Sequence, residues 1–129
     1  MRAIDTNVLV RLLVRDDAGQ ASAAEAFVAK GAWVSHLVLA ETVWVLDSVY
    51  GLSPAQVADA VEMLLDHREL VIERGDCVSA ALAHFRRRPK LGFTDCLVLE
   101  SARAAGHLPL GTFDAPLSSL PDAERIRVR

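Results

Sequence analysis

The stretch Arg2-Ala3-Ile4-Asp5-Thr6-Asn7-Val8-Leu9-Val10 decides the fold. Residues 2–5 are predicted to form a short buried strand, while Val8 and Leu9 begin the apolar repeat of a helix. The strand therefore passes directly into a helix, with one acid, Asp5, at the junction. Junctions of this kind are typical of α/β proteins, in which buried parallel strands alternate with helices.

The same alternation continues along the chain. The sequence predicts further strands at residues 32–34, 70–73, 108–112 and 126–128, and helices at 17–30, 36–50, 54–67, 76–87 and 94–105. The clearest local signal is Ser53-Pro54-Ala-Gln56, which is typical of a capped helix start. We therefore expect one α/β domain over residues 1–129, a three-layer α/β/α sandwich with a mostly parallel four- to five-stranded sheet.

Three more acids, Glu41, Asp95 and Asp114, stand alone in apolar segments. A carboxylate on a segment directed to the core is costly unless it is paired or binds a metal. Ligands of parallel sheets bind beyond the carboxyl ends of the strands, where Asp5 and Asp114 are expected. We therefore predict that the four acids meet there, hold one or two Mg²⁺ or Mn²⁺ ions, and act in phosphate-ester hydrolysis.

Each acid also has a simpler explanation. Asp5 could cap the first helix, Asp95 could be a first-turn acid that favours the helix dipole, and Asp114 could be a turn residue. Glu41 lies beyond the reach of capping, so its alternative is a buried pair with Arg or Lys. All of these alternatives must hold together for the pattern to be an accident.

The charge balance limits the partners. A formal charge of -3 and a pI near 5.7 argue against general coating of nucleic acid, but not against a local basic patch. The run Arg86-Arg87-Arg88-Pro89-Lys90, just before Asp95, is a candidate for binding RNA phosphates, and a solvated charged face is the alternative. Trp33 and Trp44 are expected in the core.

The remaining features favour a cytoplasmic protein. Cys77 and Cys96 form no CxxC pair or disulfide framework and are expected to be small core residues. The N-terminus has no secretory signal, and no apolar stretch is long enough to span a membrane. The histidines show no paired ligand spacing, so a zinc site is not expected.

Four segments resemble, in order, the motifs of the PIN-domain ribonucleases, and among these the toxin subunits of VapBC-type toxin–antitoxin modules. The segments are Asp5-Thr6-Asn7, Ser35 to Glu41, Phe93-Thr94-Asp95-Cys96-Leu97, and Thr112-Phe113-Asp114. The resemblance spans nearly the whole chain. Singly the motifs are short, but four in order along one small domain are specific.

The resemblance implies cleavage of single-stranded RNA with Mg²⁺ or Mn²⁺, homodimerisation, and inhibition by a cognate antitoxin. Asp5, Glu41, Asp95 and Asp114 would be the catalytic and metal-binding residues. Thr6, Asn7, Ser35 and Thr112 would be supporting polar groups, and Arg86, Arg87, Arg88 and Lys90 would position the RNA backbone.

Several alternatives stay open. Other members of that family process RNA without an antitoxin, and a PIN-like fold could also serve as a non-catalytic binding module. A receiver-type phosphorelay domain clusters acids at strand ends too, but it needs paired acids early in the chain and a late Lys. This chain offers no Lys after Asp114.

Overall fold

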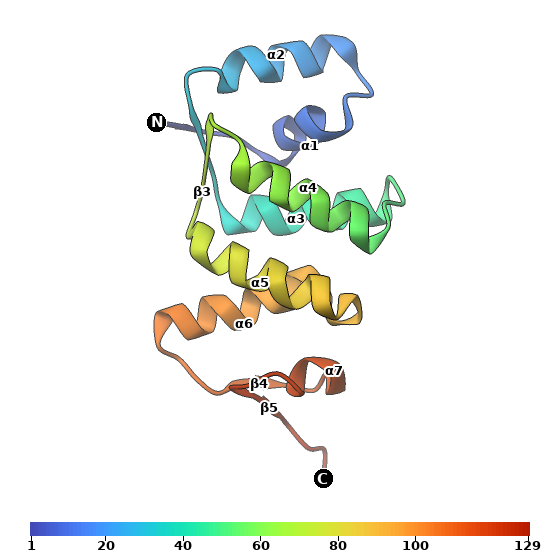
Figure 1. Ribbon diagram of the computed structural model, residues 1–129, viewed down its shortest axis with the longest axis vertical. Coiled ribbons are helices and arrows are strands. Elements are labelled where there is room, and N and C mark those ends of the chain that lie inside the picture. Colours follow the sequence, from blue (N-terminus) through green and yellow to red (C-terminus); the bar gives the residue numbers. More distant parts are fainter. The chain divides into compact units, whose positions relative to one another are not determined.

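The computed structural model describes residues Met1–Arg129 and divides the chain into two compact units, Met1–Gly75 and Asp76–Arg129. Helices and short strands alternate along both (Figure 1). The structure has five strands, four of them at predicted positions, and all pair in parallel, three in the first unit and two in the second. The α/β class is therefore confirmed, while a single domain over residues 1–129 stays a prediction.

The first unit is built on a parallel sheet in the order β1-β2-β3. Its strands are β1 (Arg2–Ala3), β2 (Ala32–Val34) and β3 (Leu70–Ile72). Its helices are α1 (Thr6–Val14) and α2 (Ala18–Val28) between β1 and β2, and α3 (His36–Ser48) and α4 (Pro54–Asp66) between β2 and β3. Two helices in each connection let the chain return to the same end of the sheet before the next strand begins.

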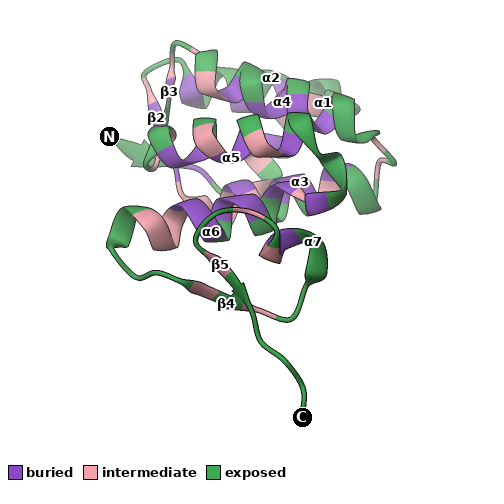
Figure 2. Ribbon diagram, turned by 60° about the horizontal axis from the view of Figure 1, so that its bottom comes forward, coloured by how far each residue is buried: buried purple, intermediate pink, exposed green.

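Apolar burial holds this unit together. Helix α1 packs on α2 and α3, and α4 packs on α3 and β3. Leu9, Leu39, Leu46 and Val61 are almost completely buried, and the buried faces of these helices are coloured in Figure 2. Full burial of one such side chain contributes about 1.5–3 kcal/mol.

Side chains mark the helix starts as the sequence predicts. Ser53 and Gln56 form a capping box at α4, and Asp17 caps α2 by accepting a hydrogen bond from the Gln20 N–H at 2.9 Å. Ser35 accepts one from the Val38 N–H at 3.1 Å and so caps α3. These bonds satisfy backbone donors that a helix start leaves without partners.

The second unit holds α5 (Gly75–Arg87), a short 3₁₀ helix η1 (Pro89–Leu91), α6 (Phe93–Ala105) and the small helix α7 (Ala115–Ser118). Two parallel strands, β4 (Leu110–Thr112) and β5 (Ala123–Arg125), flank α7. Between α5 and α6, the rings of Phe85 and Phe93 meet edge to face, with centroids 6.1 Å apart.

Some predicted boundaries and positions are wrong. The last strand covers residues 123–125 rather than 126–128, because Ala123–Arg125 pairs with β4. Helix α6 begins at Phe93, with Gly92 rather than Thr94 at the cap position. The two tryptophans are not in the core, since Trp33 is 37% and Trp44 62% exposed. In β2 the buried side chains alternate with Trp33, which therefore points away from the core face.

Candidate active site

The parallel sheet of the first unit collects polar residues at its carboxyl edge. Asp5 follows β1 after Ile4, Ser35 follows β2 directly, and Glu73 follows β3 directly. The pairing continues to this edge, since the Ile4 N–H donates to the Trp33 carbonyl and the Glu73 N–H donates to the Val34 carbonyl. Parallel strands end on the same side, so the three residues lie along one edge.

Asp5 is the N-cap of α1. Its Oδ1 accepts a hydrogen bond from the Val8 N–H at 3.1 Å, so the alternative role named for Asp5 is present in the structure. Capping uses one carboxylate oxygen and does not exclude a second role, because an ionised carboxylate has several lone pairs. The backbone N–H groups at the start of α1 also face this position.

Glu41 is held by the residue that follows Asp5. The Thr6 hydroxyl, in the first turn of α1, donates a hydrogen bond to Oε1 of Glu41 on α3. This contact joins two segments 35 residues apart and brings the first two predicted acids into one neighbourhood. The supporting role of Thr6 in catalysis stays a prediction.

Glu73 is a candidate that the sequence interpretation missed. Its Oε1 accepts a hydrogen bond from the His36 N–H at 2.8 Å, at the start of α3. The signal was present in Leu70-Val71-Ile72-Glu73, where an acid follows a short apolar strand. Glu73 was instead predicted to be the last residue of the strand.

A pocket of about 440 Å³ opens beside Asp5 between α1 and α2. Asn7, Arg11 and Phe27 contribute to its walls. Arg11 is already engaged, since its guanidinium donates to Gln20 at 2.6 Å and to Asp16 at 2.8 Å. Asn7, predicted as a supporting polar group, is exposed and adjoins this pocket.

The second unit brings the other two acids together. Asp95 lies in the first turn of α6, and Asp114 is the N-cap of α7, where it accepts from the Leu117 N–H at 2.9 Å. Partial burial, and then the negative charge of Asp114, raise the pKa of Asp95 above its ordinary value. The two carboxylates are therefore close enough for the charge of Asp114 to act on Asp95.

Two neighbours shape this pair. Thr112, another predicted supporting group, accepts a hydrogen bond from the Asp114 N–H at 3.0 Å and so fixes the turn after β4. Gly92 has φ +77°, and a Cβ there would lie 3.6 Å from Oδ2 of Asp95. The left-handed backbone conformation at this position suits glycine and lets the chain pass close to the carboxylate.

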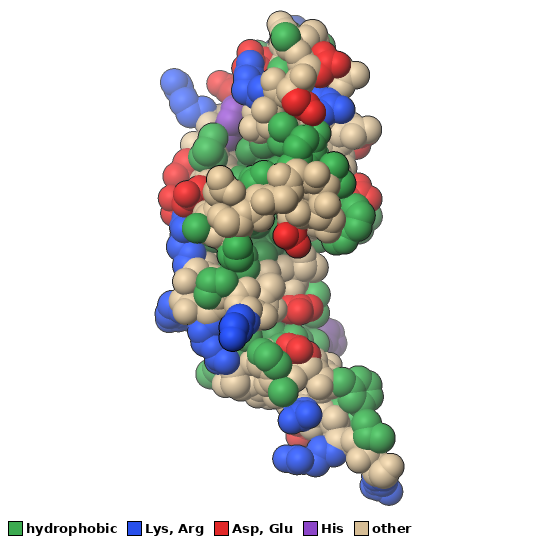
Figure 3. All heavy atoms as spheres, turned by 90° about the vertical axis from the view of Figure 1, so that its right-hand side faces the viewer, with side chains coloured by type: hydrophobic (Ala, Val, Ile, Leu, Met, Phe, Trp, Pro, Cys, Tyr) green, Lys and Arg blue, Asp and Glu red, His purple; other side chains and the backbone are tan.

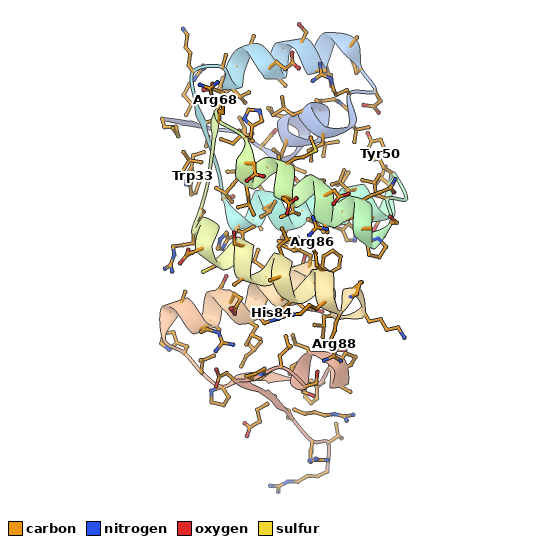
Figure 4. The ribbon with its side chains drawn as sticks, in the orientation of Figure 1. Trp33, Tyr50, Arg68, His84, Arg86 and Arg88 are labelled. Atoms are coloured by element: carbon orange, nitrogen blue, oxygen red, sulfur yellow. The ribbon has the colours of Figure 1, made fainter.

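The basic run lies in the same unit as Asp95 and Asp114. Arg86, Arg87, Arg88 and Lys90 are all exposed, at the end of α5 and in η1. Figure 4 labels Arg86 and Arg88, and Figure 3 shows Lys and Arg side chains gathered at the height of α5 and α6 in Figure 1. Arg88 is partly engaged, since it donates to the Ser119 hydroxyl at 2.5 Å.

The expectation that the four acids lie on core-directed segments is wrong, because all four are exposed. Around Glu41 the apolar neighbours do not create a buried face: Leu37 is 80% and Trp44 62% exposed. Among the four acids, partial burial raises the pKa of Asp95. Metal binding is supported mainly by charge repulsion and by the types of ligand present.

The ligand types fit a hard divalent cation. Each unit presents a pair of exposed acids with a hydroxyl residue beside them, and oxygen donors suit Mg²⁺ and Mn²⁺. Neither unit by itself gathers three or more potential ligands. The convergence of all four acids, and their role in catalysis, therefore stay predictions.

Thiol chemistry is not supported. Cys77 and Cys96 are both buried and free, which confirms their predicted position in the core. Burial, with smaller contributions from the charges of Asp95 and Glu100, raises the pKa of the Cys96 thiol to about 11. A thiol with this pKa is protonated at neutral pH and is a poor nucleophile.

Parallel strands, with carboxylates exposed where they end, define an α/β protein of the kind that binds divalent cations. A model of the PIN domain family matches residues 3–122, so the chain belongs to that family. PIN domains are generally metal-dependent nucleases and bind divalent metal ions. Neither the curated proteins nor the solved structures contain a significant match. None of the helices is both long and apolar enough to cross a membrane.

Adding Mg²⁺ or Mn²⁺ should raise the melting temperature of the wild type and should not raise that of Asp5→Asn. A cation that binds only the folded state stabilises it by mass action, and the substitution removes one charged ligand. Asparagine is also a good N-cap, so α1 should keep its start. Differential scanning fluorimetry across a metal titration measures both proteins.

Asp17→Asn is the matched control, because Asp17 also caps a helix in the first unit but lies away from the carboxyl edge. It should keep the full metal-induced shift. Equal shifts in Asp5→Asn and the wild type would contradict the assignment of Asp5.

Asp95→Asn should stabilise the metal-free protein at neutral pH. A raised carboxyl pKa means that the folded state binds more protons than the unfolded state between the ordinary and the raised pKa. The stability of the wild type therefore falls as pH rises through that window and stays lower above it. Asparagine carries no charge and avoids this loss.

Melting curves in EDTA over a pH series test this expectation. The gap between variant and wild type should close below the ordinary pKa range of aspartate. A gap that is independent of pH would show that the charge of Asp95, disfavoured by burial and by Asp114, is not its cause.

Proposed function

We propose that the protein is a Mg²⁺- or Mn²⁺-dependent endoribonuclease that cleaves single-stranded RNA and acts as the toxin of a type II toxin–antitoxin module. The observation that carries the nuclease proposal is the pairing of exposed acids within a PIN domain: Asp5 with Glu41 through Thr6, and Asp95 with Asp114. Each pair lies next to the start of a helix, where backbone N–H groups favour negative charge.

The four acids would hold one or two cations. When bound, the metal would supply activation of the attacking water and neutralisation of charge on the phosphate oxygens. Asp5 and Asp114 are fixed by their capping bonds, Glu41 by the Thr6 hydroxyl, and Asp95 by the first turn of α6. These restraints hold the carboxylates in place before substrate binds, which reduces the reorganisation needed during reaction.

Exposed basic residues support an RNA substrate. Arg86, Arg87 and Lys90 lie within a few residues of Gly92 and Asp95 and face solvent. Side chains of this kind bind phosphates without reading sequence, so they would position the strand and leave target choice to other surfaces. Unpaired RNA is favoured because its backbone can bend into a carboxylate site while its bases remain accessible.

Exposed apolar side chains on α3 and α4 support protein partners. Leu37, Trp44 and Met63 are each more than 60% exposed, which is unusual for large apolar residues on a surface without partners. A homodimer and a cognate antitoxin are the partners we propose. Leu37 and Trp44 lie on the same side of α3 as Glu41, so a protein bound there would also restrict access to that acid.

Two other functions would use the same fold. A PIN-fold nuclease that processes RNA without an antitoxin would share the site and lack the inhibitor. A non-catalytic binding module would not need four exposed acids, and all four are present here. Cleavage assays separate the enzymes from the binding module, and co-expression with a neighbouring small gene product separates the toxin from the processing nuclease.

Purified protein should cut total cellular RNA into discrete fragments with Mg²⁺ or Mn²⁺, and should not do so in EDTA. Asp95→Asn should reduce the rate at least about a hundredfold, since it removes a predicted metal ligand. Gel electrophoresis with mapping of fragment ends measures the rate and names the target. Asp122→Asn, in the same unit but outside the acid pairs, serves as the control.

Cleavage that survives EDTA would contradict the metal-dependent proposal. An inactive wild type that is folded would support the binding-module alternative.

Thr6→Val should lower the cleavage rate about 10- to 100-fold, because it removes the hydroxyl that positions Glu41. Thr6→Ser keeps that hydroxyl and should stay close to the wild type. The comparison is made from single-turnover rates at saturating metal. If both variants lost activity equally, packing of the Thr6 methyl group rather than its hydrogen bond would explain the effect.

A further inference from the structure

A second hollow lies in the second unit, next to Asp114 in sequence. It has a volume of about 420 Å³, and its lining residues are Phe113, Arg125, Ile126, Arg127 and Val128. Phe113 is 65% exposed, although it is a large aromatic residue. None of the positions proposed for metal binding or for the basic run belongs to this lining.

Strand pairing builds this hollow. Strands β4 and β5 are parallel, with Thr112 opposite Arg125, and the Ile126 N–H donates to the Thr112 carbonyl at 2.7 Å. Both strands therefore end on the same side. Beyond β4 the chain continues into Phe113 and Asp114, and beyond β5 it continues into Ile126 and Arg127. The hollow thus lies at the carboxyl edge of β4 and β5, where the candidate acid Asp114 also lies.

The two arginines that line the hollow are available to bind a ligand. Neither Arg125 nor Arg127 takes part in an ion pair or a side-chain hydrogen bond. Other arginines of this unit are engaged: Arg103 binds Glu100 and Asp122, and Arg88 binds Ser119. Figure 3 shows basic and hydrophobic side chains next to one another along the C-terminal tail.

An exposed ring beside two unpaired guanidinium groups matches the chemistry of a nucleotide. A base can stack on Phe113, and the adjoining phosphate can accept hydrogen bonds from an arginine fork. The apolar side chains of Ile126 and Val128 give the base a surface that excludes water. An acidic peptide would use the arginines but would gain little from a flat aromatic face.

We infer that this hollow is a nucleotide subsite, in which Phe113 stacks on one unpaired base of the RNA and Arg125 and Arg127 bind its phosphate. The inference rests on the proposed function, because it takes RNA as the ligand. The subsite would hold the nucleotide adjacent to the one bound at Asp114. Stacking tolerates every base, so the subsite contributes affinity and position rather than sequence choice.

Fluorescence of a short single-stranded RNA that contains 2-aminopurine tests the inference. In EDTA the wild type should bind this RNA without cutting it and should quench the analogue as it stacks. Phe113→Leu should remove the quenching and weaken binding about tenfold. Phe113→Tyr keeps an aromatic ring and should keep both signals, and the melting temperature of each variant checks that it is folded.

Substitutions of Arg127 and Arg129 in the C-terminal tail form a matched pair that tests the phosphate contact. Arg127→Gln should weaken binding and lower the salt dependence of the binding constant by about 0.7 in log–log slope. Arg129→Gln removes the same charge two residues further on, outside the lining, and should leave affinity and slope close to those of the wild type. Equal losses in both variants would overturn the phosphate contact.

The outcomes separate the subsite from the nuclease. Quenching lost in Phe113→Leu and kept in Phe113→Tyr supports the subsite even if no metal restores cleavage, in which case the nuclease proposal alone fails. Metal-dependent cleavage together with unchanged binding by Phe113→Leu overturns the subsite and leaves the nuclease proposal standing. Preferential binding of an acidic peptide over the RNA would also overturn it.

Discussion

The rest of the structure depends on parallel strand pairing. In the first unit, hydrogen bonds between β1, β2 and β3 place Asp5, Ser35 and Glu73 along one edge, and in the second unit the β4–β5 pair places Asp114 beside the tail. A parallel pair forces the chain to cross back through helices, so β1, β2, β3 and β4 are each followed by a helix start. Polar side chains and backbone N–H groups therefore lie together at the carboxyl ends of the strands. Strand pairing alone brings Asp5 and Asp114 to such positions.

The helix starts and the acid pairs act in opposite directions. Capping bonds at the helix starts hold Asp5 and Asp114 in place, whereas partial burial, and then the charge of Asp114, raise the pKa of Asp95. The fold therefore keeps the charges of Asp95 and Asp114 in unfavourable interaction. A protein without a use for concentrated negative charge would gain stability by losing one of them, which agrees with the activity typical of PIN domains.

Local patterns predicted the helices and strands well, because caps and apolar repeats act over a few residues. Ser35, Asp17 and the Ser53–Gln56 box are found where they were expected. Exposure was predicted less well, since Leu37, Glu41 and Trp44 all face solvent in a segment that reads as core. Periodicity cannot separate a buried face from one kept apolar for a partner. Glu73 was missed, and the contact of Thr6 with Glu41 was not foreseen, because both depend on pairing between segments distant in sequence.

The double duty of Asp5 and Asp114 has an evolutionary consequence. Both carboxylates cap helices through a single oxygen, and asparagine can make the same bond. A single Asp→Asn substitution at either position would therefore remove the proposed metal ligand without unfolding the protein. A copy of the gene with such a change would still produce a folded chain with its basic and apolar surfaces intact. Under the function that we propose, it would compete with the active form for the same RNA or the same protein partner, so a dominant inhibitor would lie one mutation from the nuclease.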